Sequence, residues 1–207
     1  LELGITGKFE GASAIIIPSL CDTLKTMGEN WKYAVPDIKF IPMTYPQNRK
    51  PAFGIAYTRA GYERVIKELE ECTGAEFSPD KLAESNRLYN EHNAAMRKID
   101  ALLAKHAEIT VQERSDIFAS ANYMLVEEHT ALVSKLITEL EAADESVGNF
   151  PIVISGILTD MDGLSETFDE FGMHIVADDV CAQSRQYRTD VPFGADALQA
   201  LAEKFAN

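Results

Sequence analysis

Cysteine is scarce in this 207-residue sequence: Cys21, Cys72 and Cys181 are the three present, and no two of them have CxxC spacing. Because this is an odd number without CxxC spacing, neither a disulfide framework nor a compact zinc site can be built from local sequence. A metal site that used these thiols would need ligands brought together by folding, or ligands supplied from outside the chain.

Basic residues and long apolar runs are also limited. The sequence has 19 Lys and Arg against 33 Asp and Glu, a formal net charge of -14, which argues against nonspecific binding to nucleic acid or an anionic membrane, since both need a basic face. No apolar run approaches the roughly 20 residues of a spanning helix, and the first residues lack a charged-then-apolar signal pattern. We expect a cytoplasmic protein without nucleic-acid or membrane partners, and a fragment of a longer chain, because the sequence starts without Met.

Two nucleotide-binding motifs are missing as well. Neither GxGxxG nor GxxxxGK[ST] occurs, so a loop that cradles nucleotide phosphates is not indicated. Hydrophobic residues, in contrast, make up 46% of the chain, enough for a substantial core.

The segment around Cys21 carries the clearest chemistry. The short β-branched run 14–17 predicts a buried parallel strand that Pro18 ends. A helix is expected from Thr23 to about Tyr33, with Asp22 or Ser19 as its N-cap. Cys21 then lies between the carboxyl end of a strand and the amino end of a helix, where ligands bind in α/β sheets and where thiolate is favoured. The alternative is a buried cysteine that acts as a small hydrophobic residue.

A second short strand is predicted over residues 38–43. The loop after it, residues 44–51, is rich in proline and carries Arg49 and Lys50 at the same predicted sheet edge. These two cations either meet a phosphate or carboxylate or are simply solvated.

The middle of the chain predicts an all-helical layer. Hydrophobic spacing indicates helices over about 58–72, from Ser78 to about His106, and from about 110 to 143. His92 and His129 lie on two of these helices, but neither has the i, i+4 partner of a helical metal motif, so metal binding is not expected there. Cys72, just before the helix stop at residues 73–74, is expected to be structural.

The pattern then returns to α/β. A strand over 151–156, a helix over 164–171 and a strand over 173–177 predict a parallel right-handed unit. Several polar or small residues lie at the end of the first strand or just after the second, at one sheet edge, and are our candidate site residues: Ser155, Gly156, Asp178, Asp179, Cys181, Ser184 and Arg185. We therefore expect an α/β fold in which parallel-sheet Rossmann-like segments flank a helical layer, divided as residues 1–57, 58–146 and 147–207.

Five segments together resemble the 2-hydroxyacyl-CoA dehydratase and benzoyl-CoA reductase family, subunits of the D-component type. The segments run in order along nearly the whole chain: Ile17-Pro-Ser-Leu-Cys-Asp22, Leu88-Tyr-Asn-Glu-His-Asn93, Glu127-Glu-His129, Ile154-Ser-Gly156 and Val176-Ala-Asp-Asp-Val-Cys-Ala-Gln-Ser-Arg185. The first and last of these are the most specific in combination.

The resemblance implies part of a two-domain subunit that holds a [4Fe–4S] cluster and works as a heterodimer with a second homologous subunit. An ATP-dependent iron–sulfur activator would deliver one electron, and a 2-hydroxyacyl-CoA would be converted through a ketyl radical to the 2-enoyl-CoA. Cys21 matches one cysteine ligand of the cluster, and Cys181 is the second candidate ligand. With so few ligands, these 207 residues alone should not hold a cluster. Asp178, Asp179, Ser184 and Arg185 either orient the cluster or thioester, or cap and pair at a helix start.

Two other functions stay open on the residues themselves. One is a bilobal α/β module that closes on a small ligand without chemistry of its own, and the other is a scaffolding subunit that has lost the cluster. Under the dehydratase hypothesis, glutaryl, lactyl, phenyllactyl and isocaproyl thioesters are all possible substrates. Within the same family, the nearest alternative reaction is reduction of an aromatic thioester.

Overall fold

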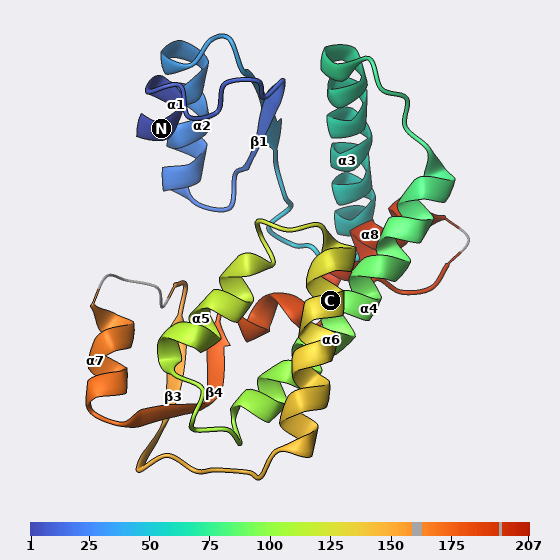
Figure 1. Cartoon of the computed structure of the whole chain (residues 1–207). Coiled ribbons are helices and arrows are strands. Elements are labelled where there is room, and N and C mark those ends of the chain that lie inside the picture. Colours follow the sequence, from blue (N-terminus) through green and yellow to red (C-terminus); the bar gives the residue numbers. More distant parts are fainter. Residues whose placement is uncertain (159–162, 195) are drawn as a thin grey trace. The chain divides into compact units, whose positions relative to one another are not determined.

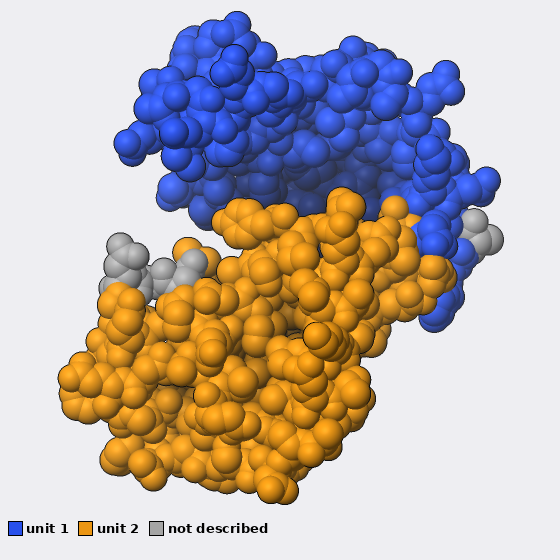
Figure 2. Space-filling view, viewed as in Figure 1, with its two compact units in different colours: residues 1–84, 191–207 blue, residues 85–190 orange. Residues whose placement is uncertain are grey.

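A computed structural model describes residues 1–158, 163–194 and 196–207. The chain forms two compact units, one of residues 1–84 with 191–207 and the other of residues 85–190, coloured separately in Figure 2. The expected α/β class is confirmed, because both units combine helices with a small parallel sheet (Figure 1). In the described part of the chain, no helix is both long and apolar enough to cross a membrane.

The sheet of the first unit pairs β1 (Ala14–Pro18) with β2 (Lys39–Met43) in parallel, with Ile16 opposite Ile41. Helix α2 (Asp22–Ala34) packs Trp31 against one face, and α3 (Ala52–Thr73) packs Val65 against the other. Residues 15 and 17 of β1 contribute to the α2 side, and residues 41 and 43 of β2 contribute to the α3 side. Ile16 of β1 is 44% exposed, so the strand predicted to be buried is covered on its α2 side and not at this residue.

Two helix starts in this unit differ from the prediction. The N-cap of α2 is Cys21 itself, not Asp22 or Ser19. Helix α3 begins at Ala52 rather than near Thr58, directly after Pro51, whose extended backbone serves as the N-cap. The prediction missed residues 52–57 because they lie outside the amphipathic stripe from which the helix was predicted. The predicted stop at Gly74 is confirmed, because this residue has the left-handed φ of 70° that glycine tolerates best.

The helical region consists of α4 (Pro79–Leu103), α5 (Val111–Ser120) and α6 (Val126–Ala142). Ser78 caps α4 as predicted, since its hydroxyl accepts from the Lys81 amide at 3.3 Å. The single helix predicted over 110–143 is wrong. The amides of Asn122 and Tyr123 bond to carbonyls three residues back, and the Asn122 side chain donates to the carbonyl of Ala119, so the helix tightens and ends there.

The sheet of the second unit pairs β3 (Phe150–Gly156) with β4 (Met173–Val180) in parallel, and α7 (Leu164–Glu170) connects them in sequence. Strand β4 extends beyond its predicted end, so Asp178 and Asp179 lie within the strand. A 3₁₀ turn, η1 (Ser184–Tyr187), follows. The two short helices at the chain ends, α1 (Glu2–Ile5) and α8 (Ala197–Ala206), belong to the first unit.

The core of the second unit joins its helices to the residues after β4. Met96 and Ile99 of α4 are 0% exposed and pack with side chains of α5, α6 and η1. The other buried members are Leu103, Phe118, Val133, Ile137, Leu140 and Tyr187. This packing connects α4, α5 and α6 directly to the turn that carries Cys181 and Arg185. Helix α3, which was predicted in the same layer, belongs to the first unit.

Candidate functional site

Cys21 lies at the carboxyl edge of the β1–β2 sheet. The Ser19 amide donates to the carbonyl of Met43 at 2.8 Å, which holds the two strand ends together. The Cys21 sulfur accepts from the Leu24 amide at 3.5 Å, and the side chain is exposed. A thiol that caps a helix N-terminus and faces outward is placed to ligate a metal or meet an electrophile, so the buried hydrophobic alternative does not describe this residue.

The loop after β2 packs on α8, within the same unit. Tyr45 stacks on Phe205 with ring centroids 4.0 Å apart, and the Arg49 guanidinium lies over the same ring at 5.9 Å. Arg49 is therefore held by a cation–π contact, a contact that neither of the two expectations for this residue had included.

The edge of the β3–β4 sheet brings the other predicted residues together. Ser155 pairs in register with Asp179, Gly156 pairs with Val180, and the Cys181 amide donates to the Gly156 carbonyl at 3.0 Å. The prediction that Ser155 and Gly156 lie next to the residues after β4 is confirmed.

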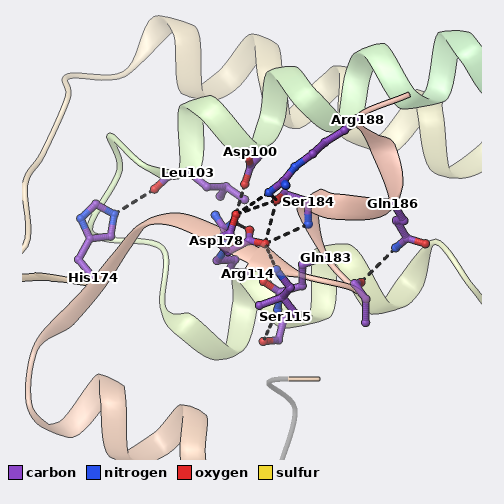
Figure 3. Close-up of polar contacts among 12 residues, drawn as sticks. Asp100, Leu103, Arg114, Ser115, His174, Asp178, Gln183, Ser184, Gln186 and Arg188 are labelled. Atoms are coloured by element: carbon purple, nitrogen blue, oxygen red, sulfur yellow. Dashed lines mark hydrogen bonds and ion pairs between the residues drawn. The ribbon is translucent and has the colours of Figure 1, made fainter. Parts of the chain in front are cut away.

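Asp178 faces the interior of the unit. Its side chain is 0% exposed, and its Oδ1 accepts from the amides of Val180 and Ser184 at 2.9 and 3.2 Å and from the Ser184 hydroxyl at 2.8 Å (Figure 3). These bonds fold the backbone of residues 178–184 into a tight turn. Asp178 and Ser184 therefore position the turn that presents Cys181, and no open carboxylate faces a ligand from this position.

Arg114 is the residue that sequence reasoning missed. It comes from α5, its side chain is 4% exposed, and its Nη2 donates to Asp178 Oδ2 and to Asp100 Oδ1, both at 2.5 Å (Figure 3). The guanidinium also lies over the Phe118 ring at 5.1 Å. One buried cation thus ties α4, α5 and β4 together. In the sequence it looks like an ordinary solvated charge, and only the fold brings the two carboxylates to it.

Asp179, Arg185 and Arg188 form a second, more exposed network. Arg185 bonds both carboxylate oxygens of Asp179, at 3.0 and 2.6 Å, and Arg188 bonds Oδ1 at 2.8 Å. The hydrogen bonds from Arg185 first and Arg188 second hold the pKa of Asp179 below its usual range. Arg185 Nη1 also donates to the Cys181 sulfur at 2.8 Å, so this arginine connects Asp179 to the thiol.

His92 and His129 form a buried pair. The sequence places them on separate helices, 37 residues apart, and the fold brings His92 Nε2 to 2.9 Å from His129 Nδ1. His129 Nε2 lies 3.1 Å from both the Ser120 hydroxyl and the Ile117 carbonyl. Burial first, and the neighbouring His129 second, lower the pKa of His92 to about 4. The pair therefore cross-links α4, α5 and α6, with the His92 ring neutral at pH 7.

Acid should weaken this unit through His92. Its pKa is lowered from 6.5 to about 4 in the folded chain, so the unfolded chain binds the proton more readily between these values. The free energy of unfolding is expected to fall by about 3 kcal/mol from pH 7 to pH 4 through this residue, and this contribution should be fully present above about pH 6.5. Urea unfolding at a series of pH values measures this. His92→Gln should flatten the decline, and equal slopes in both proteins would contradict the assignment.

A metal centre needs several donor side chains close together. Within residues 1–158, 163–194 and 196–207, no three His, Cys, Asp or Glu side chains are grouped to hold a metal ion. Cys21 is exposed and could supply one thiolate ligand. The Cys181 sulfur, in contrast, already accepts a hydrogen bond from Arg185. A cluster bound at Cys21 would need its other thiolates from further polypeptide.

Comparison with known proteins gives a consistent picture. The family model described as 2-hydroxyglutaryl-CoA dehydratase, D-component, matches residues 1–207. The (R)-phenyllactyl-CoA dehydratase beta subunit of Clostridium sporogenes is 35% identical over 209 residues, covering 100% of this chain and 56% of that protein. The (R)-2-hydroxyglutaryl-CoA dehydratase subunit beta of Acidaminococcus fermentans is 35% identical over 212 residues, covering 100% of this chain and 55% of that protein.

A more distant relative is one of the subunits of benzoyl-CoA reductase from Thauera aromatica. It is 23% identical over 209 residues, covering 99% of this chain and 54% of that protein. The chain thus spans about half the length of the curated relatives it matches.

Proposed function

Because the chain belongs to the 2-hydroxyglutaryl-CoA dehydratase D-component family, we propose that it is part of a subunit of an iron–sulfur enzyme that dehydrates a 2-hydroxyacyl-CoA to the 2-enoyl-CoA. The observation that carries the proposal is Cys21, an exposed thiol at the carboxyl edge of a parallel sheet and at the N-cap of α2. Both features are typical of a cysteine that binds a ligand.

Cys21 would hold a [4Fe–4S] cluster together with thiolates from other polypeptide, and Cys181 is the second candidate ligand. The bound cluster would supply the single-electron chemistry that removal of an unactivated α-hydroxyl group requires. The protein itself would position the side chains that bind the cluster and the substrate. The Asp178–Arg114 network does this for the turn at residues 178–184, and the Asp179–Arg185 pair does it for the Cys181 sulfur.

The partners follow from the same premise. Relatives with 35% identity are named beta subunits, which supports a heterodimer with a second homologous subunit. An ATP-dependent iron–sulfur activator would deliver the electron. The thioester would lie at the edge of the β3–β4 sheet, beside the candidate residues Ser155 and Gly156, where the backbone at Gly156 leaves room for a ligand to approach.

The test is turnover by the assembled enzyme. The full-length subunit is co-expressed with its partner, purified without oxygen, and supplied with the activator, ATP, a reductant and a panel of 2-hydroxyacyl-CoA thioesters. We expect formation of the corresponding 2-enoyl-CoA that depends on the activator. Binding of thioesters without any dehydration would favour the ligand-binding module, and neither binding nor turnover would favour the scaffold.

A further inference from the structure

Strand β1, in the first unit, has an outer edge that no strand among the described residues covers, because it pairs with β2 alone. The carbonyl of Ser13 accepts from the Lys39 amide at 3.3 Å, and the Ser19 amide donates to the Met43 carbonyl at 2.8 Å. Successive residues of a parallel strand direct their backbone groups to opposite sides, so the odd-numbered residues of β1 bond to β2. The N–H and C=O of Ile16 therefore point to the outer edge.

Ile16 is open at its backbone and at its side chain. In the described part of the chain, no residue hydrogen-bonds to its N–H or C=O. Its side chain lies on the same face of the sheet as that of its register partner Ile41, which is 0% exposed and packs against Val65 of α3. Ile16 itself is 44% exposed. Helix α3 thus covers this face over β2 but leaves it open over β1.

The outer edge of β2 is protected, in contrast to that of β1. Natural sheets block an edge strand with charged side chains or with proline. Pro42 faces the outer edge of β2 and has no N–H, and its carbonyl accepts from Arg64 at 2.9 Å. Lys39, at the start of β2, pairs with Glu68.

Strand β1 lacks these devices over most of its length. It contains no charged residue, and its proline, Pro18, is the last residue of the strand, so the edge at residues 14–17 stays open. An uncharged run of β-branched residues is typical of an interior strand in a parallel sheet that is covered on both faces. A sheet of two such strands is also smaller than a stable sheet usually is.

The occupant that fits this edge best is a strand of the same subunit. The chain covers 56% and 55% of the two relatives that are each 35% identical to it, so a little under half of each relative lies outside the match. A five-residue edge is far too small for the roughly 1,200 Å² that a stable interface between separate chains buries, whereas two segments of one polypeptide are already tethered. The net charge of -14 also opposes pairing between two copies.

We propose that β1 is an interior strand of the complete subunit, and that a strand from polypeptide outside residues 1–207 pairs along its outer edge. That strand bonds to the N–H and C=O of Ile16 and covers the Ile16 side chain. The inference does not depend on which reaction the enzyme catalyses. Because β1 leads directly to Cys21, the added strand also brings further polypeptide next to this thiol.

Amide hydrogen exchange tests the pairing. It is measured for the full-length subunit, alone at two protein concentrations and assembled with its partner. The Ile17 amide, which points to β2, is the internal reference. The Ile16 amide should exchange within about tenfold of the Ile17 rate in every preparation. Much faster exchange of Ile16 would overturn the proposal. Protection that requires the partner would assign the edge to the other subunit, and protection that rises with concentration would assign it to a second copy; either result also overturns it.

A matched pair of substitutions in the full-length subunit tests the covering of the side chain. Ile16→Lys should raise the equilibrium constant for unfolding at least about tenfold, because an ammonium replaces an apolar group that the added strand buries. Tyr33→Lys changes a side chain of α2 that is 86% exposed, and its effect should stay within about threefold. An effect of Ile16→Lys as small as that of Tyr33→Lys would contradict the proposal. If Ile16→Lys does not fold, the exchange rates of the native chain decide.

Discussion

Replacing Arg114 by methionine is expected to destabilise the chain by about 3–5 kcal/mol. The substitution keeps most of the apolar volume but removes the guanidinium that pairs with the Asp178 carboxylate, whose side chain is 0% exposed, and leaves Asp100 without this partner as well. A buried carboxylate without its cation has neither hydration by water nor an ion pair to offset the loss of that hydration. Urea unfolding at pH 7 measures the change.

The matched control is Lys98→Met on α4. The Lys98 ammonium pairs with Glu141 at 2.7 Å, but both side chains are about half exposed, so its loss should cost less than about 1 kcal/mol. Adding Asp178→Asn to Arg114→Met should recover part of the lost stability, because the amide oxygen can still accept from the Ser184 amide and hydroxyl. If Arg114→Met lowers the free energy of unfolding no more than Lys98→Met does, this network does not anchor the turn.

Replacing Cys21 by serine is expected to lower turnover of the assembled enzyme by about 100-fold or more. Loss of residues that only support metal ligands typically costs about 10–100-fold, and a ligand itself should cost at least that much. Stability should change little, since serine is among the preferred N-cap residues and can accept from the Leu24 amide as the thiol does.

Cys72→Ser is the matched control. Cys72 is half-buried near the end of α3, where its thiol donates to the carbonyl of Leu69 at 3.4 Å, and a serine hydroxyl can make the same bond. Its turnover should stay within about threefold of the native enzyme, because a substitution away from the site acts only through small changes in stability. Equal losses in the two variants would mean that both act through folding.

Much of the fold follows from the hydrophobic periodicity of the sequence and from residues that begin or end helices and strands. The β-branched run before Pro18 and the apolar run before Gly156 predicted strands, and Ser78, Pro79 and Gly74 predicted helix ends through local chemistry. The errors occur where tertiary or turn geometry overrides that pattern. The break before Leu125 depends on hydrogen bonds that tighten the end of α5, and apolar spacing continues across it without a sign of the interruption.

The candidate site was predictable only in part. Sequence order and parallel pairing sufficed to bring Gly156 close to Cys181. The role of Arg114 was not predictable, because a charged residue on a helix is indistinguishable from a solvated one until its carboxylate partners on other elements are known. The contact between His92 and His129 was missed for the same reason, since 37 residues separate them in sequence.

The central claim is that Cys21 gives a thiolate to an iron–sulfur cluster, and iron bound to the anaerobically purified full-length complex tests it most directly. The native complex should be brown, with broad absorption near roughly 400 nm and about four irons per cluster, and Cys21→Ser should lose that iron while Cys72→Ser keeps it. A colourless native complex, or a Cys21→Ser complex with undiminished iron, would contradict the account.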